Sequence, residues 1–166
     1  MKLYYTAIDL PTGVAFAAAT EKGLVRLTLR VPPLAEFLDE IEVQFGAPVV
    51  EDDKPFRLLR RELKDYFAGR PVAFTTPLDL RGTEFQMAVW RALLTVPYGE
   101  VRSYRWLADA VGRSHAARAV GGAVGRNRVG IIVPCHRIIE SSGGLGGYGW
   151  GLDVKRRLLE IEGALQ

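Results

Sequence analysis

The chain contains one cysteine, Cys135, in the stretch Pro-Cys-His-Arg, so that His136 and Arg137 follow it directly. A thiol reacts as a nucleophile once it is deprotonated, and an ordinary cysteine has a pKa of about 8.5. If the chain turns after Pro134, the imidazole could take the thiol proton, directly or through a water. The motif therefore indicates a candidate nucleophile. The alternative interpretation is an inert cysteine in the core.

A carboxylate usually completes such a pair, because it holds the imidazole in one tautomer. In the C-terminal half of the chain the candidates are Glu160 and Glu162, which lie in an amphipathic stretch near the end. One cysteine and two histidines argue against a cysteine-rich zinc site and against a histidine-only metal site. We therefore expect no metal site of either kind.

The formal net charge is +3, and it is unevenly distributed. Residues 1–80 hold 10 basic and 12 acidic residues, whereas residues 81–166 hold 12 basic and 7 acidic residues. No acidic residue lies between Asp109 and Glu140. The arginines of that interval are Arg113, Arg118, Arg126, Arg128 and Arg137. Such a surface suits a polyanion such as DNA, and a solvated face without a partner is the alternative.

Hydropathy also bears on location. No stretch approaches the length needed to span a membrane, and the start of the chain lacks a long apolar segment. A free thiol fits a reducing compartment. These features predict a cytoplasmic protein without a membrane partner.

The elements that would position the thiol divide into two parts, with a boundary near residues 78–83. In the first part, alternating apolar residues and turn signals predict strands, and apolar residues at helical spacing predict two helices. The predicted strands are 2–10, 13–20 and 23–31, and the predicted helices are 32–46 and 53–71. Residues 72–82 are predicted to form a strand and a connection. We expect domains at residues 1–80 and 81–166.

The second part is predicted to be mostly helical. The helices are expected at 83–96, 103–112, 114–127 and 152–163, with a short buried strand at 130–134 and a glycine-rich loop at 141–151. Thr83, Ser103 and Ser114 are the expected N-caps. The two middle helices resemble a helix-turn-helix, although many helical hairpins bind nothing. The second of them is rich in small residues, including Ala117 and Gly121, which allow close approach by a bulky partner or by another helix.

Several motifs together resemble the O6-alkylguanine-DNA alkyltransferase family. From the N-terminal side they are FQMAVWRALLTVPYGEVRSY, ARAVGGAVGRN, PCHRII and GGYGWGLDVKRRLLEIEG. They lie between Phe85 and Gly163 in the order and spacing of the family. The resemblance implies an α+β fold. A small N-terminal α/β domain with an antiparallel, ribonuclease H-like sheet would precede a mostly helical domain with a winged-type helix-turn-helix.

The resemblance also implies an activity. Members of the family transfer an alkyl group from the O6 atom of guanine, and less readily from the O4 atom of thymine, to the cysteine of the Pro-Cys-His-Arg motif. The thioether is stable, so each molecule would act once and without a cofactor. The expected partner is double-stranded DNA bound through its minor groove. We expect a monomer, and whether it binds cooperatively along DNA is left open.

Individual roles follow only by position in the motifs. His136 would deprotonate Cys135 through a water, Glu162 would orient His136, and Asn127 would brace the helix-turn-helix against the active-site loop. Tyr148 would line the pocket and help to neutralise the leaving guanine.

The expected DNA contacts also follow from the resemblance. Tyr104 would crowd the phosphate of the target nucleotide, and Arg118 would take the place of the base that is flipped out. The backbone N–H of Gly149 would face the O6 atom. Further contacts are expected from Arg137, Ser114, Ala117 and Gly121.

This sequence departs from the pattern of some relatives. Trp150 stands where several relatives carry glycine, which predicts an altered pocket rim and an altered tolerance for large alkyl groups. Some relatives bind zinc in the N-terminal domain, but residues 1–80 contain no cysteine or histidine. The alternatives to a repair protein are a catalytically silent alkyltransferase-like protein that binds lesions, a Cys-His hydrolase and a transcription factor. The presence of Cys135 argues against the first. Alanine and glycine offer little to base edges, which argues against the last.

Overall fold

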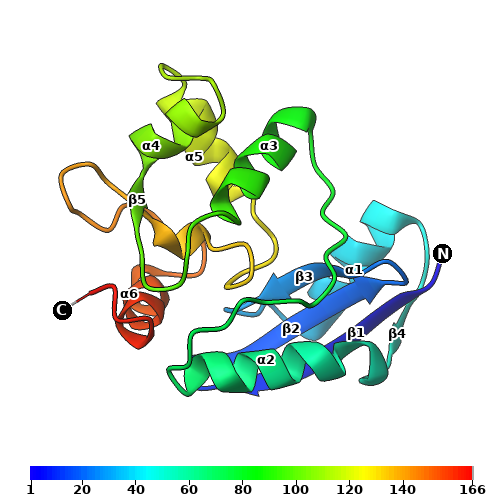
Figure 1. Cartoon of the computed structure of the whole chain (residues 1–166). Helices are drawn as coiled ribbons and strands as arrows, with labels where there is room; N and C mark the ends of the chain where they lie inside the picture. The colour runs from blue at the N-terminus through cyan, green and yellow to red at the C-terminus, as the bar shows by residue number, and fades with distance from the viewer. Residues whose placement is uncertain (166) are drawn as a thin grey trace.

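Alternating apolar residues at the start of the chain form a hairpin and a third strand, as the sequence predicts. The computed structural model describes residues 1–165 (Figure 1). Strands β1 (Leu3–Leu10), β2 (Gly13–Thr20) and β3 (Leu24–Thr28) pair antiparallel. A short strand that the sequence did not predict, β4 (Val49–Glu51), pairs parallel with β1 and gives the sheet the order β3-β2-β1-β4.

The sheet has one helix on each face (Figure 1). Helix α1 (Leu34–Phe45) covers one face with Phe37 and Ile41, and Gly46 ends it in a left-handed conformation with φ 65°. A short 3-10 turn, η1 (Lys54–Phe56), leads into α2 (Arg57–Phe67) on the other face. Both predicted helices are confirmed.

The strand predicted within residues 72–82 is wrong, whereas the connection predicted there is confirmed. This segment crosses between the two parts of the chain and makes one isolated bridge, between Leu24 and Leu78. The amide of Leu24 donates to the carbonyl of Pro77 at 2.9 Å, and the amide of Asp79 donates to the carbonyl of Leu24 at 2.9 Å. Pro77 has no N–H group to extend a ladder, which limits the pairing to this point.

The C-terminal part holds four helices within the described residues: α3 (Glu84–Leu93), α4 (Tyr104–Ala110), α5 (Ala117–Gly125) and α6 (Leu152–Ile161). Thr83 and Gln86 cap α3 reciprocally, and the side chain of Ser103 accepts from the amide of Trp106 at the start of α4. Both N-cap predictions are confirmed.

The N-cap prediction at Ser114 is wrong. Helix α5 begins at Ala117, its N-cap residue is Ala116, and no side chain caps it. Ser114 instead lies exposed in the turn between α4 and α5.

The predicted strand at 130–134 is also wrong, although the segment is buried as expected. It curls into a turn in which Ile131 has φ 68°, a conformation that β-branched residues rarely adopt. A 3-10 turn, η2 (Cys135–Arg137), follows it. The pair β5 (Arg102–Ser103) and β6 (Ile138–Ile139) forms a small parallel sheet beside α4.

One apolar core joins the two parts of the chain. It includes Leu24 and Leu27 of the sheet, Leu59 of α2 and Val89 of α3, all essentially inaccessible to solvent. Because the two parts share this core, the sheet domain can position residues of the helical domain. No helix among residues 1–165 is long and apolar enough to cross a membrane.

Candidate functional site

The thiol lies at the end of the buried turn, at the first residue of η2. Cys135 is 5% exposed. The side-chain amide of Asn127 donates to its Sγ at 3.1 Å and to the carbonyl of Val133 at 2.9 Å. Burial raises the pKa of the Cys135 thiol to about 11, and the Asn127 hydrogen bond and the positive charge of Lys155 oppose this rise only in part. The group is therefore a thiol at neutral pH and needs a base to react.

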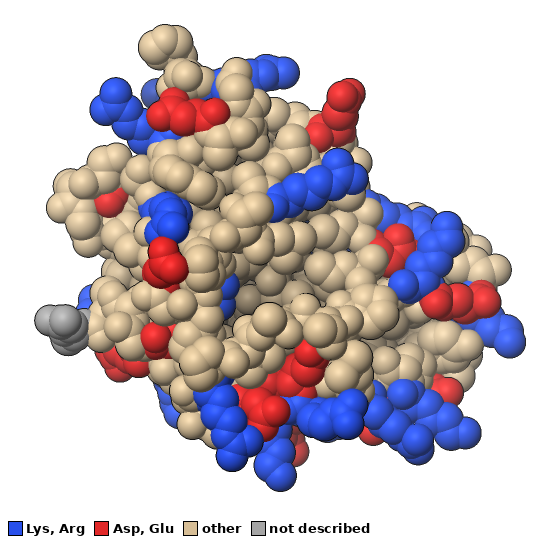
Figure 2. Space-filling view, in the orientation of Figure 1, with Lys and Arg blue, Asp and Glu red and all other residues tan. Residues whose placement is uncertain are grey.

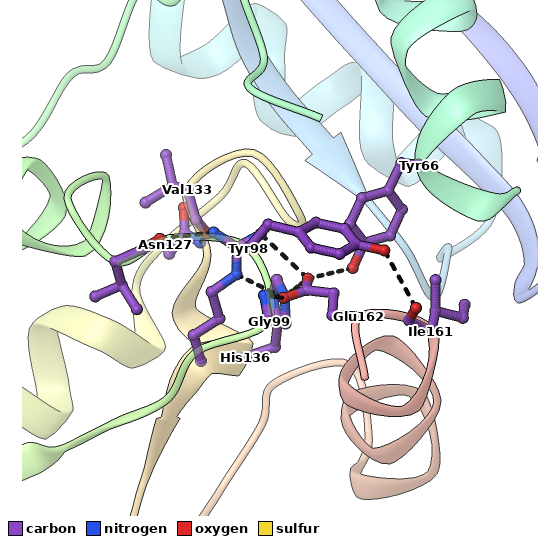
Figure 3. Close-up of polar contacts among 10 residues, drawn as sticks. Tyr66, Tyr98, Gly99, Asn127, Val133, His136, Ile161 and Glu162 are labelled. Carbon is purple, nitrogen blue, oxygen red and sulfur yellow. Dashed lines mark hydrogen bonds and ion pairs between the residues drawn. The ribbon is translucent and has the colours of Figure 1, made fainter. Parts of the chain in front are cut away.

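The imidazole of His136 pairs with Glu162, as expected. Its Nε2 lies 2.6 Å from Oε2 of Glu162, and both side chains are fully buried (Figure 3). Glu160, the other candidate, is exposed. Because the carboxylate occupies Nε2, the proton of the neutral ring resides there and Nδ1 carries the lone pair. Nδ1 is buried and has no hydrogen-bond partner among the described residues.

Glu162 accepts hydrogen bonds from four residues in three segments of the chain. Oε2 accepts from the Tyr66 hydroxyl at 2.6 Å, and Oε1 accepts from Nε of Arg137 at 2.8 Å and from the amide of Gly99 at 3.2 Å (Figure 3). Burial alone would raise the pKa of Glu162, but the hydrogen bond from His136 and the charge of Arg137 outweigh it and hold the pKa at about 2. Burial lowers the pKa of His136. The pair is therefore an ionised carboxylate beside a neutral imidazole.

The buried position of Arg137 contradicts one prediction. We expected it to contact DNA, but it is 6% exposed. Its guanidinium is fixed by Glu162 and by the carbonyl of Val96, at 2.7 Å from Nη1. A side chain enclosed in this way cannot reach a phosphate, so Arg137 stabilises the site from within. The other four arginines of the basic interval are exposed.

The thiol borders a cavity of about 380 Å³, within the range of small-molecule sites. Of the residues predicted for the site, Tyr104, Gly121, Asn127, Cys135, Tyr148 and Gly149 line it. The N-terminal domain contributes Arg26, Thr28 and Glu40, which the sequence analysis missed. Uncharged residues occupy the centre of the face shown in Figure 2, and acidic and basic side chains are interspersed around it.

Tyr148 and Trp150 form one wall of this cavity. Their rings meet edge to face, with centroids 5.5 Å apart. The Tyr148 hydroxyl is buried without a hydrogen-bond partner among residues 1–165, and burial raises its pKa well above the ordinary value. It therefore keeps its proton for donation. A Cβ on Gly130 would lie 2.9 Å from Cζ3 of Trp150, so glycine at this position makes room for the indole.

Lys155 is a site residue that the sequence analysis missed. It is 0% exposed. Its ammonium donates to the carbonyls of Ile138 at 2.6 Å and Gly147 at 3.0 Å, and also to that of Leu145. Burial lowers its pKa to about 8. The lysine thus ties the glycine-rich loop to α6. The sequence did contain a signal for this role. A basic residue directly follows Val154, on the inward-facing side of a predicted helix.

Several small residues of α5 are not explained by packing within the chain. The helix packs on α3 and α4. Its buried side chains are Val120, Ala123 and Val124, whereas a Cβ on Gly121 or Gly122 would meet nothing within 4 Å. This leaves an open, narrow surface beside the cavity. Arg118 and Ala117 are exposed on the same helix, and Tyr104 is half-buried at the start of α4.

Metal-binding side chains do not gather in the part of the chain that the structure describes. Within residues 1–165, no group of three or more histidine, cysteine, aspartate or glutamate side chains is placed to hold an ion.

Comparison with known proteins follows the same division of the chain. Residues 3–80 match the family described as 6-O-methylguanine DNA methyltransferase, ribonuclease-like domain, and residues 84–164 match the DNA binding domain of the same name. The fold and the site thus define a two-domain protein in which a DNA-binding-type domain carries a buried cysteine. The chain belongs to the methylated-DNA–protein-cysteine methyltransferase family, as the motifs predicted.

Relatives of that name match over nearly the full length. The protein from Methanosarcina barkeri is 42% identical over 161 residues, covering 96% of this chain and 97% of the relative. The protein from Mycobacterium tuberculosis is 46% identical over 160 residues, covering 96% and 92%. The crystal structure of Mycobacterium tuberculosis OGT in complex with DNA aligns with a TM-score of 0.85 at 44% identity, covering 96% of this chain and 92% of that one.

Proposed function

We propose that the chain is a DNA repair protein that acts once, by moving an alkyl group from O6 of guanine, and less readily from O4 of thymine, to its own Cys135. The observation that carries this proposal is a buried thiol bordering a cavity of about 380 Å³, followed directly in the chain by a histidine whose imidazole is oriented by an ionised carboxylate. Membership of the family supports the same activity.

The thiol needs help to ionise. With a pKa of about 11, forming the thiolate at pH 7 costs on the order of 5 kcal/mol. Nδ1 of His136 accepts the proton through a bridging water, and Glu162 stabilises the imidazolium that results. Asn127 stabilises the thiolate through its N–H donor.

The transfer is a single displacement. The sulfur of Cys135 forms a bond to the alkyl carbon, the bond from that carbon to O6 breaks, and its electron pair remains with the guanine. The Tyr148 hydroxyl and the backbone N–H of Gly149 donate to the leaving base. The proton lost from the thiol balances the one that the guanine gains. The thioether is stable, so the protein is consumed.

The lesion must leave the base stack to reach the thiol, at a cost of a few kcal/mol. We propose that α5 enters the minor groove, where the open surface at Ala117 and Gly121 allows close approach, and that Ser114 contacts the backbone. Arg118 fills the gap left by the flipped base, and Tyr104 crowds the phosphate of the target nucleotide. We further propose that a monomer acts in the cytoplasm.

Transfer of a labelled methyl group from O6-methylguanine in duplex DNA tests the activity. We expect at most one equivalent of label per chain, and none in Cys135→Ala. Continued release of product would point to a hydrolase. Retained lesion binding without any transfer would point to the silent, lesion-binding alternative, which the burial of the thiol favours.

The role of Arg118 has a separate test. Arg118→Ala should slow repair of duplex DNA far more than reaction with free O6-benzylguanine, which needs no base flipping. Arg91→Ala, at an exposed position on α3, removes the same charge from a residue for which no DNA contact is proposed and is the control. An equal loss of reaction rate in Arg118→Ala with duplex DNA and with free O6-benzylguanine would refute the flipping role.

A further inference from the structure

A tyrosine of the N-terminal domain reaches the carboxylate of the proposed active site. Tyr66 lies on α2, is 0% exposed and donates its hydroxyl to Oε2 of Glu162 at 2.6 Å. The same oxygen is 2.6 Å from Nε2 of His136 (Figure 3). The hydroxyl and the imidazole therefore share one acceptor atom, although 96 residues separate Tyr66 from Glu162.

We propose that Tyr66 is a positioning residue of the alkyl-transfer site, which holds Glu162 in place and limits how strongly that carboxylate attracts the proton of His136. The inference rests on the proposed function, because it assigns a role within that reaction. It also gives the N-terminal domain an influence on the base of the reaction, through Glu162, in addition to support.

The ring of Tyr66 is held on several sides. Phe67 and Tyr98 meet it edge to face, with centroids 5.2 and 5.9 Å away, and Phe74 lies 5.9 Å away at 41°. A ring packed in this way cannot swing its hydroxyl to another acceptor. A buried hydroxyl without a partner is costly, so the hydroxyl and the carboxylate fix each other.

The carboxylate divides its negative charge among its donors. The charged and titratable groups around Glu162 and His136 are Arg137 on η2, Lys155 on α6, Tyr66 on α2, and Tyr98, Tyr148 and Cys135. Of the three tyrosines, Tyr66 is the one that donates to Oε2. Without its hydroxyl, Oε2 would interact more strongly with the imidazolium, which raises the pKa of His136. A larger fraction of His136 would then be protonated, and unable to act as a base, at acidic pH.

Tyr66→Phe removes the hydroxyl and keeps the ring. The readout is the single-turnover rate of benzyl transfer from free O6-benzylguanine to the full-length chain between pH 5 and pH 9. We expect the acidic limb of the profile to move to higher pH by half a unit to one unit. This shift lowers the rate on that limb by about 3- to 10-fold and leaves the rate at pH 8 within about 2-fold of wild type.

Tyr98→Phe is the matched control. Its hydroxyl is also part-buried beside α6, but it donates to the carbonyl of Ile161 at 3.1 Å and not to Glu162. A merely structural role of the tyrosines would give both variants similar losses without a pH shift. We expect Tyr98→Phe to keep the wild-type profile.

A second substitution protects the test against a variant that fails to fold. Replacing Tyr66 with 3-fluorotyrosine keeps the hydroxyl and makes it a stronger donor, so the acidic limb should move to lower pH. Profiles of Tyr66→Phe and the fluorinated protein that both match wild type would overturn the inference, as would an equal shift in Tyr98→Phe. A wild-type chain that accepts no benzyl group would overturn the proposed function as well.

Discussion

Asn127 shows how one side chain can shape the surroundings of a nucleophile. Its amide nitrogen donates to the carbonyls of Val129 and Val133 and to the sulfur of Cys135, and its carbonyl oxygen accepts from the amide of Val129 at 2.9 Å. These bonds replace the ladder that a strand would need. They explain why an apolar, β-branched segment is a turn here, with Cys135 at its end.

We predict that Asn127→Ala lowers the free energy of unfolding by about 2–4 kcal/mol, because it leaves the buried amide of Val129 without an acceptor and removes one donor each from the carbonyls of Val129 and Val133. It also removes a donor to the sulfur, so the thiol pKa should rise. Denaturant unfolding measures the first effect, and the pH dependence of alkylation by a small reagent measures the second. Asn127→Asp keeps the acceptor, adds a negative charge and should raise the thiol pKa further. A decrease in the free energy of unfolding of less than about 1 kcal/mol in Asn127→Ala would contradict the proposed role of Asn127 in the buried turn.

At the scale of elements, α6 organises the glycine-rich loop from within. The loop carries Tyr148 and Gly149 but has no regular structure between β6 and α6. Lys155 supplies the missing organisation, because its ammonium binds the carbonyl of Ile138 in β6 and the carbonyls of Leu145 and Gly147 within the loop. A charge-assisted donor of this kind is stronger than a neutral one and fixes several backbone groups at once.

We predict that Lys155→Met frees this loop while keeping the apolar volume of the side chain. Amide hydrogen exchange at residues 145–149 should become faster, and alkyl transfer should slow by about 10- to 100-fold, since small displacements of reacting groups are costly. Arg156→Met, at the exposed neighbouring position, is the control and should change neither. Unchanged exchange in the lysine variant would show that the loop is ordered by other contacts.

At the scale of the whole molecule, the two domains share an apolar core and a buried polar junction. The junction centres on Glu162 and takes donors from α2, from the turn after α3 and from η2. The pKa of Glu162 is about 2 in the folded chain, against 4.5 for an ordinary glutamate. Because the folded value is the lower one, ionised Glu162 stabilises the fold above pH 4.5, and this stabilisation is lost as the pH falls towards 2.

We predict that this carboxylate accounts for about 3 kcal/mol of the acid sensitivity of the wild-type chain. Glu162→Gln should be less stable at neutral pH, because Arg137 loses its partner, but its free energy of unfolding should fall less between pH 4.5 and pH 2. Glu160→Gln, at an exposed neighbouring position, should keep the wild-type dependence. An equal fall in the free energy of unfolding between pH 4.5 and pH 2 in Glu162→Gln and in wild type would disprove this role of Glu162.

Local patterns predicted much of this architecture. Alternation along the first thirty residues predicted the antiparallel strands, and the caps at Thr83 and Ser103 predicted where two helices begin. Both signals depend on neighbours within a few residues, which a sequence displays directly. The pairing of His136 with Glu162 was instead implied by the family resemblance, since the residue types alone left both Glu160 and Glu162 as candidates.

Long-range packing decided the rest. Arg137 turned inward because a buried carboxylate offered it a partner, and residues 130–134 curled because Asn127 took the place of a neighbouring strand. Tyr66 reached the site from another domain. Sequence by itself determined which chemistry this protein carries and which elements hold it. Only the tertiary structure decided which polar groups share a buried acceptor, because burial makes each of them find a partner wherever the fold supplies one.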